Sequence, residues 1–384
     1  FGLGIAVKVN NWTVPFAQIF EALDRGADRI LLGNGTYFSL RRPEFKTLRT
    51  LIAEARELDD AGGELRINRH QAGLFSELES LAASVHTTAR WDAQVRSLLQ
   101  LVEGLEDAEE NPEKSSKKTS DKGTQDSPAP QKASRRVIAQ RPVPAGLQAT
   151  LRPYQVEGFQ WLSFLYEQRL GGILADDMGL GKTVQALALL AHAIEEHRAA
   201  SECAAERGES VEPFAPFLVV APTSVIANWA AEAARFLPEA KVVTITETTA
   251  GKTPLAERIA GAHLVLTSYT LLRMDEDAYT GYAHTLGGTV DDSTGEQSAP
   301  EGWGALLLDE AQFVKNTGTR AWSIARAMPA RTKIAMTGTP IENNLMELWA
   351  LLAIVADGLF PSARAFRDLY ARPAAVSYTH LRAH

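Results

Sequence analysis

Cysteine is nearly absent from this chain of 384 residues, which contains one, Cys203. A single cysteine excludes an intrachain disulfide. Cys203 lies in a polar stretch rich in alanine and glutamate, and we interpret it as an incidental surface thiol. A reducing, cytoplasmic compartment is therefore the default expectation.

Long hydrophobic runs are also missing. No apolar run approaches the roughly 20 residues that a transmembrane helix needs. The start, Phe-Gly-Leu-Gly, lacks the basic segment and apolar stretch of a signal peptide. We therefore expect no membrane partner. Hydrophobic residues make up 45% and charged residues 22%, which is ordinary for a soluble globular protein large enough for two or three domains.

An excess of positive charge is missing too, because the formal net charge is −8. Proteins that bind nucleic acid are often basic, so the bulk charge weighs mildly against such a partner. Bulk charge says little about a local groove, however, and it excludes nothing.

Both ends of the chain are unusual. The chain begins with Phe1 in what reads as the middle of a domain, and residues 376–384 show no periodicity that continues the preceding sequence. We expect a fragment whose last residues, 376–384, are foreign, like a translated sequencing adaptor. The alternative is a natural frayed terminus.

The first part of the chain, residues 1–104, predicts a small α+β accessory domain. Residues 29–40 alternate around Asn34-Gly35, a strong hairpin signal. Residues 45–58 form an amphipathic helical pattern. Further short strands are expected at 11–14 and 65–67, and helices at 15–23, 70–85 and 90–104.

Residues 105–145 predict a disordered linker, since an acidic stretch is followed by one rich in Ser, Lys, Pro and Gln. Its basic half could touch a nucleic-acid backbone, or it could be a solvated tether.

From residue 146 to 375 the pattern changes to regular β/α alternation, which predicts an α/β fold with a parallel sheet flanked by helices. The expected strands are 172–175, 217–221, 241–245, 263–267, 305–308 and 333–337. Two polar insertions, 198–216 and 277–302, are rich in turn-forming and charged residues, and we expect them to be mobile loops.

Residues 174–183 read LADDMGLGKT between an apolar strand and a long apolar helix. Glycines let backbone N–H groups approach phosphate oxygens, a lysine reaches the outer phosphates, and a threonine hydroxyl can hold Mg²⁺. The pattern predicts a nucleoside triphosphate site. Asp176 departs from it, because the strict motif has glycine there. The predicted binding residues are Asp177, Met178, Gly179, Leu180, Gly181, Lys182 and Thr183.

A second motif ends another apolar strand, where Asp309 and Glu310 follow three leucines. Nucleotide hydrolysis needs one carboxylate near Mg²⁺ and one that orients the attacking water. The alternative is an ordinary helix cap, but a preceding phosphate-binding loop favours the catalytic interpretation.

Three further sets of polar residues accompany these motifs. Gln155 carries both a donor and an acceptor and can read an adenine edge. Thr337-Gly338-Thr339 could sense the γ-phosphate, or it could be an ordinary turn. Hydroxyls and strand ends at Pro222-Thr223 and Thr267-Ser268 suit nucleic-acid phosphates. We interpret nearby Trp229 as helix packing rather than base stacking.

Taken together, residues 147–372 resemble the first motor lobe of the Swi/Snf family of ATP-dependent DNA translocases, in helicase superfamily two. The motifs LRPYQVEGFQWL, LADDMGLGKT, LVVAPTSVIANW, LTSYTLL, LLLDEAQFVKN and MTGTPIENNLMELW occur in family order. Asp176 belongs to the family's own variant of the loop. The resemblance implies a RecA-like ATP-binding lobe, and residues 1–104 weakly resemble an accessory region of some bacterial members.

Carried over by position, the resemblance assigns a role to each motif. Lys182, Asp309 and Glu310 are implied as catalytic, and Thr183 and Asp309 as metal-binding. Gln155 is implied to read adenine. The remaining groups are Gln312, Thr337, Gly338 and Thr339, which couple nucleotide state to a second lobe, and Pro222, Thr223, Thr267 and Ser268, which contact DNA.

The resemblance implies ATP and Mg²⁺ as cofactors and double-stranded DNA, or a DNA-bound protein complex, as partner. It implies a monomeric, nucleoid-associated protein. The family site is completed by a second lobe with an arginine finger, worth roughly 10³–10⁵ in rate in related enzymes. We therefore expect this fragment alone to hydrolyse little ATP. The alternatives are a strand-separating DNA helicase and a nucleotide-gated binding module without motor activity.

Overall fold

The computed structural model describes residues 6–9, 12–15, 22, 28–31, 37–41, 141–209, 213–249, 253–286, 302–360 and 362–373. Two compact units are present, one made of residues 1–125 and 358–384 and the other of residues 126–357. The larger unit contains all the predicted nucleotide-binding motifs.

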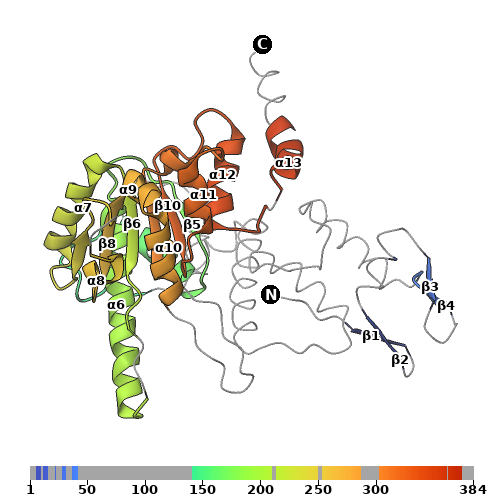
Figure 1. Cartoon of the computed structure of the whole chain (residues 1–384), viewed down its shortest axis with the longest axis horizontal. Coiled ribbons are helices and arrows are strands. Elements are labelled where there is room, and N and C mark those ends of the chain that lie inside the picture. The colour runs from blue at the N-terminus through green and yellow to red at the C-terminus, as the bar shows by residue number, and fades with distance from the viewer. Residues whose placement is uncertain are drawn as a thin grey trace, which may run out of the picture. The chain divides into compact units, whose positions relative to one another are not determined.

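The larger unit is built on a six-stranded sheet in the order β5-β10-β9-β6-β8-β7 (Figure 1). All five strand pairings are parallel. The strands are β5 Gly172–Leu174, β6 Phe217–Ala221, β7 Val242–Thr244, β8 Leu264–Ser268, β9 Ala305–Asp309 and β10 Lys333–Met336. The predicted α/β fold and RecA-like sheet are confirmed.

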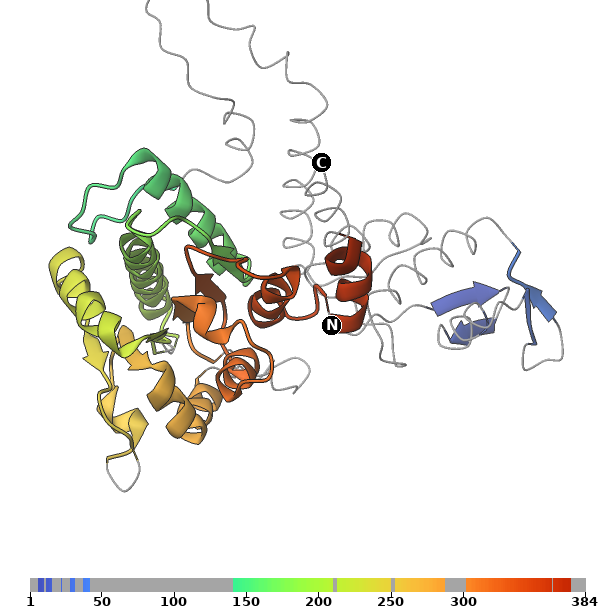
Figure 2. The same cartoon turned by 90° about the horizontal axis from the view of Figure 1, so that it is seen from above.

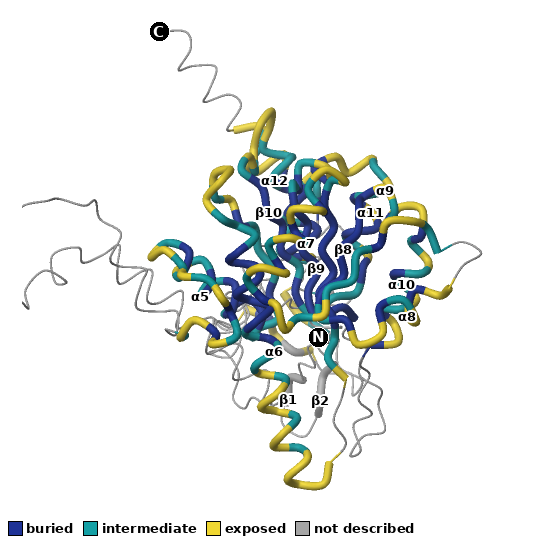
Figure 3. Tube along the Cα trace, turned by 90° about the vertical axis from the view of Figure 1, so that its left-hand side faces the viewer, coloured by how far each residue is buried: buried dark blue, intermediate teal, exposed yellow. Residues whose placement is uncertain are grey.

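The three strands β6, β8 and β9 are buried along their whole length. Their sequences are FLVVA, LVLTS and ALLLD, which are apolar except at the carboxyl ends of β8 and β9, as expected for parallel strands covered on both faces. Figure 3 shows β8 and β9 in the buried centre of the unit.

Helices cover both faces of the sheet (Figure 2). In one group α6 contacts both α5 and α7, and in the other α11 contacts both α9 and α12. The helices are α5 Pro153–Glu167, α6 Lys182–Glu206, α7 Thr223–Phe236, α8 Leu255–Arg258, α9 Tyr269–Met274, α10 Glu276–Thr285, the 3₁₀ turn η3 Ala311–Val314, α11 Arg320–Ala327 and α12 Leu345–Val355.

The predictions for the two polar insertions are wrong in part. Helix α6 continues through residues 198–206, and its second half is mostly exposed (Figure 3). Helix α10 covers residues 276–285 and buries Tyr279 and Ala283, which are four positions apart. Residues 210–212 and 287–301 lie outside the described residues.

The smaller unit is described only in short pieces. β1 Ala6–Val9 pairs with β2 Trp12–Pro15, and β3 Arg29–Leu31 pairs with β4 Tyr37–Ser39, both antiparallel. The predicted hairpin at 29–40 is confirmed, and β1 was not predicted. The same unit contains α13 Ala363–Phe366 and the π-helical η4 Arg367–Ala371.

The predicted strand at 11–14 is confirmed by β2, shifted by one residue. The remaining predictions for residues 1–104, the linker prediction for 105–140 and the tail at 376–384 fall outside the described residues. The end of the predicted linker at 105–145 is described, and there Pro144 is buried and Arg141 pairs with Glu167. In the part of the chain that is described, no helix combines the length and the apolar character of a membrane span.

Candidate functional site

The phosphate-binding loop connects β5 to α6. Gly179 and Gly181 adopt φ angles of +82° and +81°, a region that L side chains rarely occupy. A Cβ atom on Gly181 would also lie 2.5 Å from Nε2 of Gln155. Both glycines therefore shape the loop, as predicted, and bring its backbone to the N-terminus of α6, where the helix dipole favours an anion.

The ammonium of Lys182 is held by the loop itself. Its Nζ donates to the backbone oxygen of Asp176 at 2.7 Å and to that of Asp177 at 3.1 Å. Thr183 follows in the first turn of α6 and is partly exposed. The cation and the hydroxyl predicted to contact phosphate and Mg²⁺ thus lie next to each other at the start of the helix.

Gln155 supports the loop from α5. Its Nε2 donates to the Leu180 oxygen at 3.0 Å, and its Oε1 accepts from the Arg152 backbone N–H at 2.9 Å. The hydroxyl of Tyr154 donates to the same Leu180 oxygen at 3.2 Å. The side chain predicted to read adenine therefore also fixes the loop, and adenine recognition stays a prediction.

The adjacent carboxylates lie at the carboxyl end of β9. Asp309 is 7% exposed, and its two oxygens accept from neutral groups, Oδ2 from the Trp229 indole at 2.7 Å and Oδ1 from the Glu310 backbone N–H at 2.9 Å. Burial raises the pKa of Asp309, although these hydrogen bonds and the charge of Lys182 lower it in part. A buried carboxylate without a directly bonded cation among the described residues suits a divalent metal ion.

Glu310 has φ +49° and ψ +55°, the left-handed conformation that is rare outside glycine. This conformation ends β9 sharply and starts the 3₁₀ turn η3 directly after the strand. The Glu310 side chain accepts from Nε2 of Gln312 at 2.8 Å.

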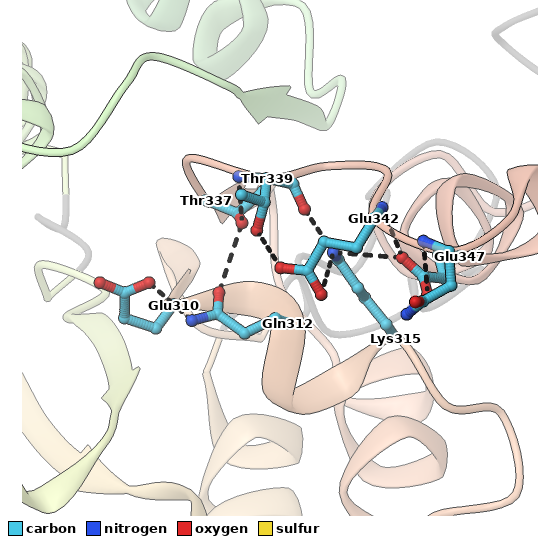
Figure 4. A network of polar contacts seen from close by, with 8 residues as sticks. Glu310, Gln312, Lys315, Thr337, Thr339, Glu342 and Glu347 are labelled. Carbon is cyan, nitrogen blue, oxygen red and sulfur yellow. Dashed lines mark hydrogen bonds and ion pairs between the residues drawn. The ribbon is translucent and has the colours of Figure 1, made fainter.

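A network of polar side chains runs from Glu310 to helix α12 (Figure 4). Gln312 accepts from the Thr337 hydroxyl at 3.3 Å, and the Thr339 backbone N–H donates to the same hydroxyl at 3.1 Å. Gly338 lies against the loop, because a Cβ atom there would be 3.4 Å from Cγ of Met178. The residues predicted to couple nucleotide state are thus brought together beside the nucleotide site.

The same network continues through three residues that sequence reasoning missed. The Thr339 hydroxyl donates to Glu342 at 2.6 Å, and Lys315 donates to the Thr339 backbone oxygen. The Lys315 ammonium is 3.3 Å from Glu347 and 3.7 Å from Glu342 (Figure 4). Lys315 is buried, which is unusual for lysine, but this burial is visible only in the structure, so the sequence did not mark the residue.

Trp229 is buried at 1% exposure, so its interpretation as helix packing is confirmed. Its bond to Asp309 was not predicted. The hydroxyl of Tyr269 donates to the Asp309 backbone oxygen at 2.8 Å, which adds a second missed contact. Glu232, one turn after Trp229 on α7, has its pKa raised by burial and by the charge of Asp309.

The residues predicted to contact DNA fall into two groups. Thr267 is fully buried and shares a hydrogen bond of 2.7 Å with Tyr279, and Ser268 caps α9 by accepting from the Leu271 backbone N–H at 3.1 Å. A buried hydroxyl cannot reach a DNA phosphate, so the predicted DNA contact is wrong for the Thr267 side chain. The Ser268 hydroxyl is already engaged in capping α9. Pro222 and Thr223 lie at the accessible N-terminus of α7.

A separate cluster joins α5 to α6. His192 is 3.1 Å from Glu167 and 3.4 Å from Glu196, and Arg141 pairs with Glu167. Burial lowers the pKa of His192, but hydrogen bonds to the two glutamates outweigh it and raise the pKa to about 9. The three residues have a metal-like grouping, but two cations already balance the carboxylates, which favours an ion-pair network.

Comparison with known proteins agrees with this geometry. The family described as "SNF2-related domain" matches residues 154–384. Chromatin-remodeling ATPase INO80 of Arabidopsis thaliana is 37% identical over 238 residues, which cover 60% of this chain and 14% of that protein. Helicase ssl-1 of Caenorhabditis elegans is 36% identical over 238 residues, or 60% of this chain and 8% of that protein.

A solved structure, the Sulfolobus solfataricus SWI2/SNF2 ATPase core in complex with dsDNA, is 30% identical with a TM-score of 0.47, and the match covers 60% of this chain and 41% of that one. The chain therefore spans a small part of the curated relatives it matches. The relatives named from Arabidopsis and Caenorhabditis are eukaryotic and do not support a bacterial affiliation, which stays a prediction. With more than half of its length matched by the family, the chain belongs to the SNF2-related domain family and carries its ATPase lobe.

Proposed function

We propose that this lobe binds ATP together with Mg²⁺ and that the intact protein couples ATP hydrolysis to translocation on double-stranded DNA or to remodelling of protein–DNA complexes. The observation that carries the proposal is the meeting of three strand ends. The loop after β5 holds Lys182, β9 ends in Asp309, and β10 leads to Gly338 beside the loop. Ligands of open α/β sheets bind at this edge.

Each residue has a chemical task in this proposal. The Lys182 ammonium has three donors, and its bonds to the carbonyl oxygens of Asp176 and Asp177 leave one for the outer phosphate oxygens of ATP. Thr183 and Asp309 supply oxygen ligands for Mg²⁺, which neutralises phosphate charge when it is bound. Glu310 orients the attacking water, and Gln155 can contact adenine with the hydrogen-bonding capacity that its internal bonds leave unused.

The family and the names of its relatives support DNA as the partner. We propose that Pro222 and Thr223 contact the DNA backbone, because the exposed start of α7 offers backbone N–H groups to phosphate. We propose that Gln312, Thr337 and Thr339 transmit nucleotide state, since their chain of hydrogen bonds begins at Glu310. We further propose that the intact protein is bacterial and monomeric, and that it associates with the nucleoid in the cytoplasm.

Nucleotide binding by the purified chain tests the first half of this function. We expect the chain to bind a fluorescent ATP analogue with Mg²⁺ and to lose that binding in Lys182→Ala. Glu310→Gln should keep binding, because it removes the charge that orients water and leaves the loop intact. Equal binding by the wild-type chain and Lys182→Ala would contradict the proposed site.

DNA-stimulated ATP hydrolysis tests the second half. We expect slow turnover by the 384-residue chain alone, since the resemblance implies that a second lobe completes the site. Rapid turnover that Lys182→Ala abolishes would contradict that expectation. An unwinding assay on a longer form separates a strand-separating helicase from a translocase. Partner binding that ignores both ATP and Glu310→Gln would indicate a binding module instead.

A further inference from the structure

Asp176 stands where a strict phosphate-binding loop has glycine, and both its backbone oxygen and its side-chain carboxylate accept hydrogen bonds. Its backbone oxygen accepts from the Lys182 ammonium at 2.7 Å, and its Oδ2 accepts from Nε2 of Gln185 at 2.9 Å. We propose that Gln185 is a positioning residue, which fixes Asp176 and through it the Lys182 ammonium that meets ATP. This inference rests on the proposed ATP site.

Gln185 is well placed for this task. It lies three residues after Lys182 in the first turns of α6 and is fully buried. Because it stands on a regular helix rather than in the loop, its position is fixed by the packing of α6 against α5. A hydrogen bond from this side chain therefore ties the loop to a regular, packed helix.

The cost of burying Gln185 indicates that packing alone does not explain it. Its Oε1 is buried and has no hydrogen-bond partner among the residues that the structure describes, and an unpaired buried polar atom is unfavourable. The oxygen lies against Gly158 of α5, where a Cβ atom would be 1.8 Å away. An apolar side chain of the same length would avoid this cost, so a purely structural role would favour methionine over glutamine.

The negative charge of Asp176 explains what the hydrogen bond from Gln185 does. A carboxylate in a loop that binds a triphosphate places like charges near each other, which is unfavourable unless the carboxylate is directed away or paired. The Gln185 amide holds this carboxylate on the α6 side of the loop. At the same time the Asp176 carbonyl faces Lys182.

The experiment uses the full 384-residue chain, with affinity for a fluorescent ATP analogue and Mg²⁺ as one readout and the melting temperature as the other. We expect Gln185→Met to weaken nucleotide binding by about tenfold, the value of one hydrogen bond to a charged group. Its melting temperature should be equal or higher, because the unpaired oxygen is gone. Should Gln185→Met fail to fold, Asp176→Ala removes the same bond from the loop side. It should also weaken binding, but by less than Gln185→Met, because it removes a negative charge near the triphosphate as well as the bond.

A reversed pair separates this bond from general packing. Gln185→Glu alone opposes two carboxylates and should weaken binding more than Gln185→Met. Adding Asp176→Asn supplies an amide donor to the new carboxylate, so the double variant should bind more tightly than Gln185→Glu alone. Recovery of this kind is not expected from a residue that only fills space.

The outcomes distinguish this inference from the proposed function. If Gln185→Met binds nucleotide as the wild type does while Lys182→Ala does not, Gln185 has no positioning role and the ATP site stands. If the reversed pair shows no recovery, the inference is overturned as well. If the wild-type chain binds no nucleotide, both the inference and the proposed site are wrong.

Discussion

The indole nitrogen of Trp229 lies 2.7 Å from Oδ2 of Asp309, and both side chains are buried. Trp229 belongs to α7 and Asp309 to the end of β9, so the contact links the helix after β6 to the strand beside it. The bond holds the carboxylate that we assign to Mg²⁺.

Trp229→Phe should remove this donor while keeping most of the ring packing. We expect the free energy of unfolding to fall by about 1.5–3 kcal/mol, the range for hydrogen bonds to charged groups. Because the bond lowers the pKa of Asp309, that pKa should rise further, and affinity for Mg²⁺ and ATP should decrease more at pH 6 than at pH 8. Urea unfolding and nucleotide titrations at both pH values measure these effects.

Trp322→Phe is the matched control for that variant. The Trp322 indole is also buried and donates to the Ala350 backbone oxygen at 2.9 Å, between α11 and α12. Its loss should lower stability by about 1 kcal/mol and leave the pH dependence of nucleotide binding unchanged. The same pH dependence in both variants would argue against a role for the Trp229 bond.

Lys315→Met should leave the carboxylate of Glu347 without its cation. The hydrogen bonds from the Glu342 and Asn343 backbones and from Lys315 lower the pKa of Glu347 despite burial. We expect a loss of about 2–4 kcal/mol in unfolding free energy, between the values for exposed and buried pairs. Arg320→Met breaks the exposed pair with Glu276 and should cost less than about 1 kcal/mol. Equal losses of unfolding free energy in Lys315→Met and Arg320→Met would show that the buried pair stabilises the fold no more than the exposed pair does.

His192 should make the stability of the lobe depend on pH. Its folded pKa is raised from 6.5 to about 9 by Glu167 and Glu196, despite burial. A raised pKa contributes stability that is fully present below pH 6.5 and is lost as the pH rises through about 9. His192→Gln should therefore flatten the decline in melting temperature between pH 6.5 and 9.

Comparison of variants is needed for this test, because Lys333 acts in the opposite direction. Burial lowers the pKa of Lys333 to about 8. The buried ammonium therefore destabilises the fold at lower pH, and this destabilisation decreases as the pH rises past about 8. The readout is therefore the difference between the wild type and His192→Gln. A decline that persists in His192→Gln would contradict the assignment.

Gly158→Ala should weaken nucleotide binding although alanine favours helices. The new Cβ atom would lie 1.8 Å from Oε1 of Gln185, so that amide must move and its bond to Asp176 is disturbed. Gly281→Ala in α10 meets open space and should stabilise the fold by about 0.5–1 kcal/mol without changing nucleotide affinity. Melting curves and nucleotide titrations distinguish the two, and equal affinity in both would count against the contact.

The strands of the lobe could be predicted because each is a short apolar run between polar segments. The predicted run 217–221 agrees fully with β6, and the other five differ by one or two residues at their ends. Helix α10 was mistaken for a loop because its acidic and glycine residues are typical of turns, while Tyr279 and Ala283 supply only a short buried face. The second half of α6 was missed because a mostly exposed helix has no apolar stripe.

The candidate site was predictable residue by residue but not contact by contact. Motifs indicated Lys182, Asp309 and Gln312 because each carries recognisable chemistry. The bond from Trp229 to Asp309 depends on β6 and β9 being neighbours, although they are far apart in sequence. Strand order is a tertiary property that hydrophobic periodicity does not encode, and the partners of Lys315 were missed for the same reason. The bond from Gln185 to Asp176 is local, but it depends on the path of the loop between them, which no motif specifies.

At position 310 thermal stability and turnover favour different residues. The left-handed backbone would be less strained with glycine, whereas the proposed hydrolysis needs the Glu310 carboxylate. A non-glycine residue in this conformation costs about 1–3 kcal/mol, which glycine at the same position would avoid. Selection of the lobe for survival at high temperature should therefore yield Glu310→Gly, a variant that lacks the carboxylate assigned to water. A screen for thermal tolerance alone would enrich inactive proteins at this position.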